Sequence, residues 1–183
     1  LYVTDRSRWR KWLQKNHSRK KEIWLIYYKK HSGKKRISYE DAVQEALCFG
    51  WIDSIVKKVD EERTAQRFSP RKSTSVLSQT NKERIRGLIK KKLMTPSGIR
   101  AVSHAFDPES DDPNDFKIPV QILNAIKKDR DAWVHFQKLP PHYVRIKIDY
   151  ILGRKYHSKE AYRASLNHFI KMTAQGKRFG FVK

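Results

Sequence analysis

The chain contains a single cysteine, Cys48, among its 183 residues. One cysteine excludes an internal disulfide framework and zinc sites built from cysteine pairs, and it favours a reducing compartment, the cytoplasm over the periplasm. Long apolar segments are also lacking, because the longest run, residues 23–28, has six residues where a membrane-spanning helix needs about 20. The sequence therefore predicts a soluble protein without a membrane-spanning segment.

Glycine-rich loops and metal-ligand spacings are missing as well. None of the seven glycines forms a phosphate-cradling motif, and the seven histidines are scattered without a pair at helical spacing beside a carboxylate. We therefore expect no metal, no cofactor and no catalytic residue that the sequence alone can assign. Five Trp, eight Tyr and eight Phe are nevertheless present, and this aromatic content excludes a disordered basic tail.

Acidic side chains are few, with 19 Asp and Glu against 41 Lys and Arg, which gives a net charge of +22. Residues 1–36, 57–100 and 117–183 carry net charges of +11, +9 and +11, whereas residues 37–56 and 101–116 carry −4 and −5. The excess is spread over both halves of the chain, so it belongs to the folded body. Such a charge favours an anionic partner, whether a small anion, an acidic protein or nucleic acid.

The first hundred residues show alternating helix and strand signals. Apolar spacing, β-branched runs and turn residues predict helices over 5–15, 39–49, 81–91 and 96–105 and strands over 23–30, 51–59 and 64–68. Ser38 and Thr95 are expected N-caps, and Gly50 is expected to end the second helix. These signals predict a small antiparallel sheet accompanied by helices.

The composition changes after Phe106. Residues 107–119 contain three prolines and five acidic residues, which is typical of a linker or exposed loop. Every later signal is helical, including an expected N-cap at Ser158. We therefore predict an α+β fold: an α+β domain over 1–106, an acidic linker over 107–119 and a helical domain over 120–183.

Asp53 is the most informative candidate for a functional site. On an extended strand its side chain shares a face with Trp51 and Ile55, and a carboxylate beside two apolar residues needs a partner. Arg67 and Arg71 are the expected donors if the following hairpin closes. Two interpretations remain open: a structural ion pair, or a small anion-accepting pocket with Trp51 as its wall.

Residues 67–75 combine cations with hydroxyl groups, which are the groups that contact phosphates. This segment adds Ser75 to the candidates, and strand pairing brings Lys30 near Asp53. The candidate ligand-binding residues are therefore Trp51, Asp53, Arg67, Arg71, Lys30 and Ser75.

Cys48 lies at the expected end of a helix with apolar neighbours. The negative pole of the helix and an apolar environment both raise the pKa of a thiol, whereas reactive thiolates favour helix N-termini or cationic neighbours. We therefore expect Cys48 to be a buried small hydrophobic residue and not a nucleophile.

Over its first hundred residues the chain resembles the bacterial YdeI/OmpD-associated proteins, also labelled bacteriocin-protection proteins. The resemblance is carried by these segments: Trp9 to Leu13 with Asn16 and His17, Ile23 to Leu25 with Lys29 and Lys30, Ile37 to Val43, Ala46 to Ser54, Arg67 to Arg71, Ser75, Ser78, Asn81 and Met94 to Gly98. The later part departs from the family pattern, because residues 156–160 replace its basic Thr-Arg run.

This resemblance implies association with an outer-membrane porin and protection against bacteriocins or cationic peptides, without a settled catalytic mechanism. The family pattern falls on Trp51, Asp53, Arg67 and Arg71, the residues already selected from the sequence. A protein of charge +22 repels cationic peptides, so we expect any protection to act through an anionic partner or indirectly.

The leading hypothesis is therefore a bacterial binding or stress-associated protein, more plausibly not an enzyme, with an anion-accepting site around Trp51, Asp53 and Arg71. One alternative is a nucleic-acid-binding protein that uses its basic faces, with some of the aromatic residues of 9–36 stacking on bases. Another alternative is an enzyme in which Asp53 acts as a base.

Overall fold

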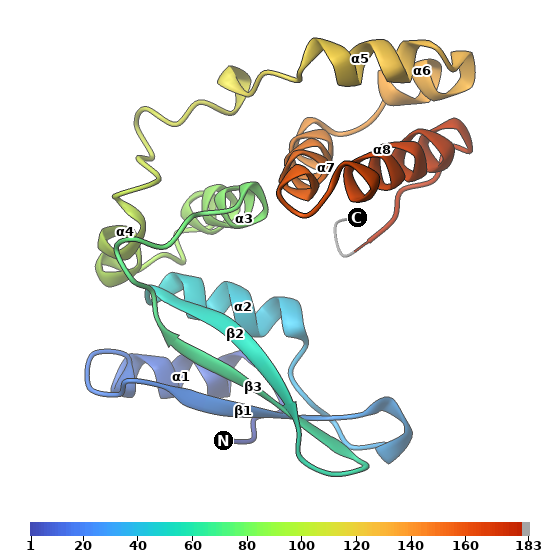
Figure 1. Ribbon diagram of the computed structural model, residues 1–183. Coiled ribbons are helices and arrows are strands. Elements are labelled where there is room, and N and C mark those ends of the chain that lie inside the picture. The colour runs from blue at the N-terminus through green and yellow to red at the C-terminus, as the bar shows by residue number, and fades with distance from the viewer. Residues whose placement is uncertain (181–183) are drawn as a thin grey trace. The chain divides into compact units, whose positions relative to one another are not determined.

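The structure is a computed structural model that describes residues 1–180 (Figure 1). The chain divides into two compact units, one formed by residues 1–77 with 84–108 and one by residues 78–83 with those from Glu109 onward. The first unit holds a three-stranded antiparallel sheet with helices, and the second holds helices. The predicted α+β class is therefore confirmed.

The first two helices of the structure are α1 (Arg6–Asn16) and α2 (Tyr39–Cys48), close to the predicted positions. α2 begins at the expected cap, where the Ser38 hydroxyl accepts a hydrogen bond from the backbone N–H of Asp41 at 3.0 Å. It ends before Gly50, whose φ of +76° is a backbone conformation that favours glycine. Local capping chemistry thus sets both ends of this helix.

The sheet contains three strands in the order β1-β3-β2, and both strand pairs are antiparallel. β1 comprises Ile23–Tyr28, β2 comprises Trp51–Lys58 and β3 comprises Arg63–Pro70. β2 and β3 form the predicted hairpin, and β1 pairs with the other edge of β3. β3 is therefore the central strand, and its side chains contact residues from both neighbours.

A β-bulge interrupts the pairing of β2 with β3. Asp53 lies opposite Phe68, but the next paired residue, Val56, lies opposite Gln66, so β2 holds one extra residue. The expectation that Ile55 shares the half-buried face of Asp53 is wrong, because Ile55 is 54% exposed. The extra residue breaks the simple alternation on which that expectation depended.

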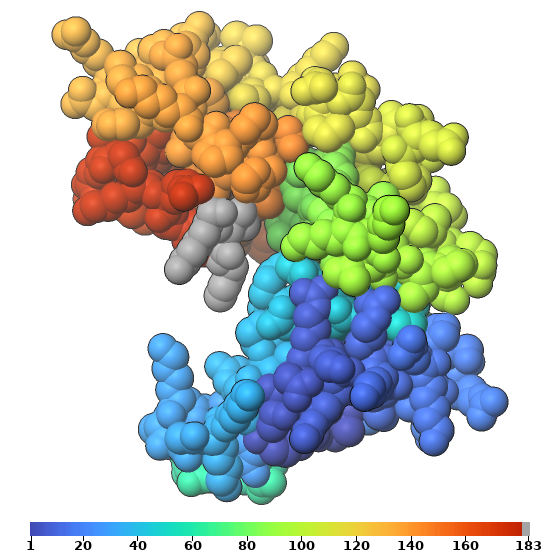
Figure 2. Space-filling view, turned by 180° about the vertical axis from the view of Figure 1, so that it is seen from behind, coloured from blue at the N-terminus to red at the C-terminus, as the bar shows by residue number. Residues whose placement is uncertain are grey.

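The core of the first unit lies between the sheet and the helices α1 and α2. Trp9 and Leu13 of α1 are fully buried, and the ring of Trp9 lies 5.5 Å from that of Phe68 on β3. In Figure 1 the two helices lie behind the sheet, and Figure 2, seen from behind, shows the dark-blue N-terminal residues on the near side. One face of the sheet is thus covered by helices.

Two further helices, α3 (Gln79–Lys90) and α4 (Pro96–Val102), follow the sheet. Thr95 caps α4 as predicted, accepting from the backbone N–H of Gly98 at 3.2 Å. A Cβ on Gly98 would lie 2.3 Å from the carbonyl oxygen of Cys48, so only glycine allows α4 to pack this closely against the end of α2.

The second unit consists of helices with their own core. Its helices after residue 119 are α5 (Val120–Lys127), α6 (Arg130–Phe136), α7 (Pro141–Gly153) and α8 (Lys159–Ala174). Ser158 caps α8 as expected, and apolar residues such as Ile122, Tyr143 and Phe169 form the core. Within residues 1–180, no helix has the length and apolar character needed to cross a membrane.

Candidate anion-binding site

Trp51 begins β2 and is a core residue. It is buried, its ring lies edge-on to that of Trp12 with centroids 5.8 Å apart, and its indole N–H donates to the backbone oxygen of His17 at 3.1 Å. These contacts fix the start of β2 against α1. Trp51 therefore supports the end of the sheet from inside the core and does not form the wall of an open pocket.

Asp53 lies on the inner face of the sheet, opposite Phe68. Its Oδ2 accepts hydrogen bonds from the Tyr39 hydroxyl at 2.9 Å and from Nε2 of Gln66 at 2.7 Å. The expected partners Arg67 and Arg71 are therefore wrong for this carboxylate, which two neutral donors satisfy. Gln66 is the reachable donor because it is two residues from Phe68 and shares its face.

Besides burial, the charge of Asp53 raises the pKa of two tyrosines, Tyr39 and Tyr27. Burial and the nearby carboxylate raise the pKa of Tyr39 to about 12, and the same two causes raise the pKa of Tyr27. The Tyr27 hydroxyl is buried without a hydrogen-bond partner among the described residues. Both tyrosines are therefore neutral at physiological pH, and Tyr39 acts as a donor to Asp53.

Arg67 lies on the opposite face of the sheet from Asp53. Adjacent residues of a strand point to opposite faces of the sheet, and Phe68 faces the core, so Arg67 points to the other face. In the register of the sheet Arg67 pairs with Trp24 of β1. Its guanidinium binds the carboxylate of Glu22 through Nε at 2.7 Å and Nη2 at 2.6 Å. Arg67 is thus a paired surface residue outside the Asp53 cluster, which consists of Asp53, Tyr39 and Gln66.

Arg71 directly follows β3 and is only 9% exposed. Its backbone N–H donates to the oxygen of Gly50 at 2.8 Å, which extends the sheet by one residue, and its Nη2 donates to the backbone oxygen of Val76 at 2.7 Å. Its Nε is buried without a hydrogen-bond partner in the part of the chain that the structure describes. One donor of this buried guanidinium is therefore unsatisfied.

The segment 71–77, here called the Arg71 loop, folds back over this side chain. The backbone N–H of Ser75 donates to the backbone oxygen of Lys72 at 3.0 Å. The backbone oxygen of Ser75 lies 2.9 Å from Nε2 of His104, which follows α4. Backbone contacts therefore hold Ser75 in the same loop as Arg71. Lys30 lies in η1 (Lys30–Ser32), at the other end of the sheet, because Tyr28 pairs with Arg63 at the start of β3.

The charge of Arg71 lacks an acidic partner among residues 1–180. Between Leu1 and Gly180 no carboxylate forms an ion pair with it, and burial alone lowers the pKa of its guanidinium. A buried cation without a counterion is costly, whereas an anion in contact with it would supply both the opposite charge and an acceptor for Nε. The arrangement is therefore suited to hold a small anion.

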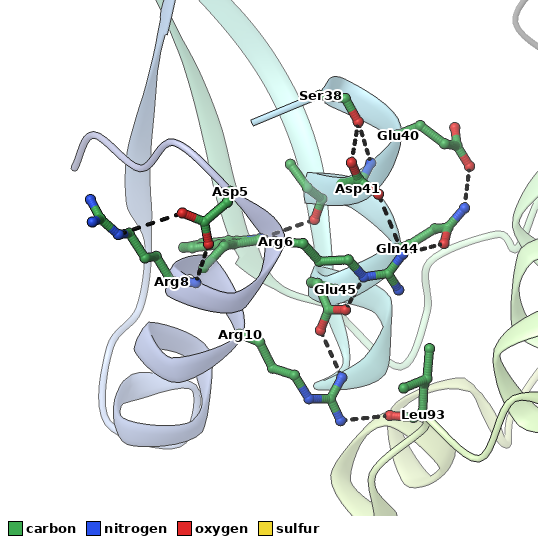
Figure 3. A network of polar contacts seen from close by, with 12 residues as sticks. Asp5, Arg6, Arg8, Arg10, Ser38, Glu40, Asp41, Gln44, Glu45 and Leu93 are labelled. Carbon is green, nitrogen blue, oxygen red and sulfur yellow. Dashed lines mark hydrogen bonds and ion pairs between the residues drawn. The ribbon is translucent and has the colours of Figure 1, made fainter. Parts of the chain in front are cut away.

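The same unit contains a buried charge of the opposite kind, Glu45 on α2, which the sequence analysis did not single out. Glu45 is 1% exposed and is bound by Nε of Arg6 and by Nη1 of Arg10, the latter at 2.7 Å (Figure 3). Arg6 also contacts Asp41 at 3.3 Å and Gln44 at 3.1 Å. We call these five residues the Glu45 network.

A signal for this network exists in the sequence. Arg6 and Arg10 are four residues apart and therefore share one face of α1, and Asp41 and Glu45 share a face of α2 in the same way. The pairing of the two faces depends on how α1 and α2 pack, about 35 to 39 residues apart in the chain. The spacing indicates two charged faces but not their contact.

Metal binding finds no support in the described residues, where no group of three or more His, Cys, Asp or Glu side chains could hold an ion. Cys48 is buried as expected, and burial together with the Glu45 carboxylate raises the pKa of its thiol to about 11. Cys48 is therefore protonated at physiological pH and is unsuited to act as a thiolate nucleophile.

Residues 1–101 match a protein family described as a domain of unknown function (DUF8412). The matched segment contains the Asp53 cluster, the Arg71 loop and the Glu45 network, whereas the helices after residue 119 lie outside it. No curated protein and no solved structure matches the chain.

Proposed function

The chain belongs to the DUF8412 family, a domain of unknown function, and from its geometry we propose that it is a binding protein that holds a small anion at Arg71. The observation that carries this proposal is a guanidinium that is 9% exposed, has an unsatisfied Nε and meets no carboxylate among the described residues. Phosphate or a carboxylate matches the planar donor edge of such a group.

The surrounding loop supports this choice of ligand. Lys72, Ser73 and Thr74 are exposed and follow Arg71 directly in the chain, so the same loop carries a second cation and two hydroxyl groups. Val76 is 89% exposed, and a loop with such an exposed segment can move aside at small cost to admit a ligand. The net charge of +22 further speeds the encounter with anions.

An enzyme that uses Asp53 as its base is less well supported. Oδ2 of Asp53 accepts hydrogen bonds from Tyr39 and Gln66, and neither donor is a cation that would assist a reacting group. The protection against bacteriocins and the porin association that the YdeI/OmpD resemblance implies rest on the sequence alone. We keep both as proposals that the anion site neither requires nor opposes.

The test is thermal stabilisation by inorganic phosphate, compared between Arg71→Met and Arg67→Met. Both variants lose one positive charge at β3 or next to it, but Arg67 is already paired with Glu22. A ligand that binds only the folded state stabilises it by RT ln(1 + [L]/Kd), about 2.7 kcal/mol at 100 times Kd. We expect phosphate to raise the Tm of wild type and of Arg67→Met, and not that of Arg71→Met.

Sodium chloride at matched ionic strength serves as the control for screening. An equal rise of Tm in all three proteins would show that phosphate acts on the general charge of the surface. That result would contradict the proposal.

A further inference from the structure

The face of the sheet that α1 and α2 leave uncovered carries a row of side chains from β1. Leu25 and Tyr27 are buried toward the helices, and Trp24, Ile26 and Tyr28 alternate with them and are only partly buried. In Figure 1 this face is turned to the viewer, and α1 and α2 lie behind it. We call it the outer face.

Two aromatic rings on the outer face are open to the surface. The ammonium nitrogen of Lys57 lies 4.8 Å from the centroid of the Trp24 ring, and that of Lys34 lies 4.5 Å from the Tyr28 ring. Both lysines are exposed, so flexible cations lie over these rings, and the ring of Tyr2 packs edge-on against that of Tyr28 with centroids 5.1 Å apart. A flat ligand can reach the rings when the lysines swing away.

The two ends of β1 are strongly basic. Residues 19–36 contain one acidic residue, Glu22, and eight basic residues: Arg19, Lys20, Lys21, Lys29, Lys30, Lys34, Lys35 and Arg36. Three of these precede the strand and five follow it. A polyanion lying along β1 would meet positive charge at both ends and aromatic rings between them.

The arginines of β3 play a smaller part in this surface. Arg67 lies opposite Trp24 and Arg63 opposite Tyr28, but Glu22 binds Arg67 and Asp60 binds Arg63. Their charges are therefore largely compensated. Lys34 and Lys58 also lie close to Glu62 and Glu61, whereas Lys57 on β2 and the other basic residues at the ends of β1 remain for contacts with phosphates.

We propose that the outer face binds single-stranded nucleic acid. Bases stack on Trp24 and Tyr28, and Lys57 and the basic ends of β1 contact the phosphates. A duplex is a poorer fit, because its bases already stack on one another and present no free face to a ring. Arg71 follows the C-terminal end of β3, past Arg67, which lies opposite Trp24, and it is not among the residues assigned to this site.

The test is fluorescence anisotropy of labelled oligo(dT) and oligo(U) of about ten nucleotides at about 50 mM salt, with a duplex of equal length for comparison. Stacking contributes about 1–3 kcal/mol per base, so we expect Trp24→Ala to weaken binding roughly five- to a hundredfold. Trp24→Phe keeps a ring and should retain most of the affinity.

A matched control is Trp133→Ala in the helical unit, since Lys127 lies over its ring at 5.0 Å in the same manner. We expect this variant to bind oligonucleotides like wild type. Binding of the duplex as tightly as the single strand, or equal affinity in wild type, Trp24→Ala and Tyr28→Ala, would overturn the proposal. Trp24-dependent binding of an acidic peptide in place of the oligonucleotides would also overturn it.

Discussion

Glu45 and Arg71 are both buried charges of the first unit, and their neighbours treat them in opposite ways. Glu45 is bound by two arginines, and although burial works to lower the pKa of Arg10, the Glu45 carboxylate outweighs it and the pKa is raised. Arg71 has a backbone oxygen as its side-chain partner, and burial lowers its pKa unopposed. The charge of Glu45 is balanced by arginines of the fold, whereas the charge and the Nε–H of Arg71 remain available to bind an anion.

This difference indicates separate roles. The Glu45 network joins α1 to α2, and Arg10 also donates to the backbone oxygen of Leu93 at 2.9 Å, so it ties together three segments of the unit (Figure 3). Arg71 ties down only its own loop, through Val76. We therefore assign stability to the Glu45 network and ligand binding to Arg71.

The largest expected effect is on Glu45. Glu45→Ala leaves two partly buried guanidinium groups facing each other without their carboxylate, so we expect a loss of about 3–5 kcal/mol in the free energy of unfolding. Urea denaturation measures this loss. Glu61→Ala is the control, since the side chain of Glu61 is 85% exposed and its pairing with Lys58 contributes at most about 1 kcal/mol. An equal loss in the free energy of unfolding for both substitutions would contradict the structural role of the Glu45 network.

A much smaller effect on stability is expected for Arg71→Met. The substitution removes a buried charge without a counterion and keeps an apolar chain of similar length, while the exposed segment at Val76 lets water reach the freed oxygen. We expect the free energy of unfolding to stay within about 1 kcal/mol of wild type in urea denaturation. A loss as large as that of Glu45→Ala would make Arg71 structural.

Asp53 is intermediate between Glu45 and Arg71, because neutral donors and not a charged partner bind its carboxylate. The pKa of Tyr39 rises from 10 to about 12, so between these pH values the unfolded chain loses a proton that the folded chain keeps. Stability is therefore expected to fall as pH rises from 10 toward 12, and Tyr39→Phe should reduce this fall. Urea denaturation at several pH values checks it, with Tyr156→Phe, whose ring is 94% exposed, as a control expected to behave like wild type.

The smallest expected effect concerns Cys48. With a thiol pKa of about 11, only about one thiol in a thousand is ionised at pH 8, and the side chain is buried. A colourimetric thiol reagent should therefore react with it only after the protein unfolds. Rapid reaction in the folded state would show that the end of α2 opens readily.

Parts of this picture depend on local chemistry and could be predicted from the sequence. Ser38, Thr95 and Ser158 cap helices as expected, because the donors they bind lie three residues away in the chain. The hairpin and the class of the fold also follow from patterns within a few residues. Such features need no knowledge of tertiary contacts.

The partners of the charged residues could not be predicted in this way. Asp53 binds Gln66 and not Arg67 because of the face of β3 that meets the core. The predicted face of Ile55 was wrong because of the bulge between residues 53 and 56. Contact between Arg6 and Glu45 requires the packing of two helices. The burial of Arg71 likewise depends on a loop that closes over it.

The central claim is that the Arg71 guanidinium binds an anion. The most direct measurement is a phosphate titration followed through the side-chain Nε–Hε resonances of ¹⁵N-labelled arginine, with Arg71→Met used to assign its signal. The account predicts a saturable shift of the Arg71 resonance at phosphate concentrations that leave Arg67 unchanged. An Arg71 resonance that does not move, or that moves no more than those of exposed arginines, would contradict it.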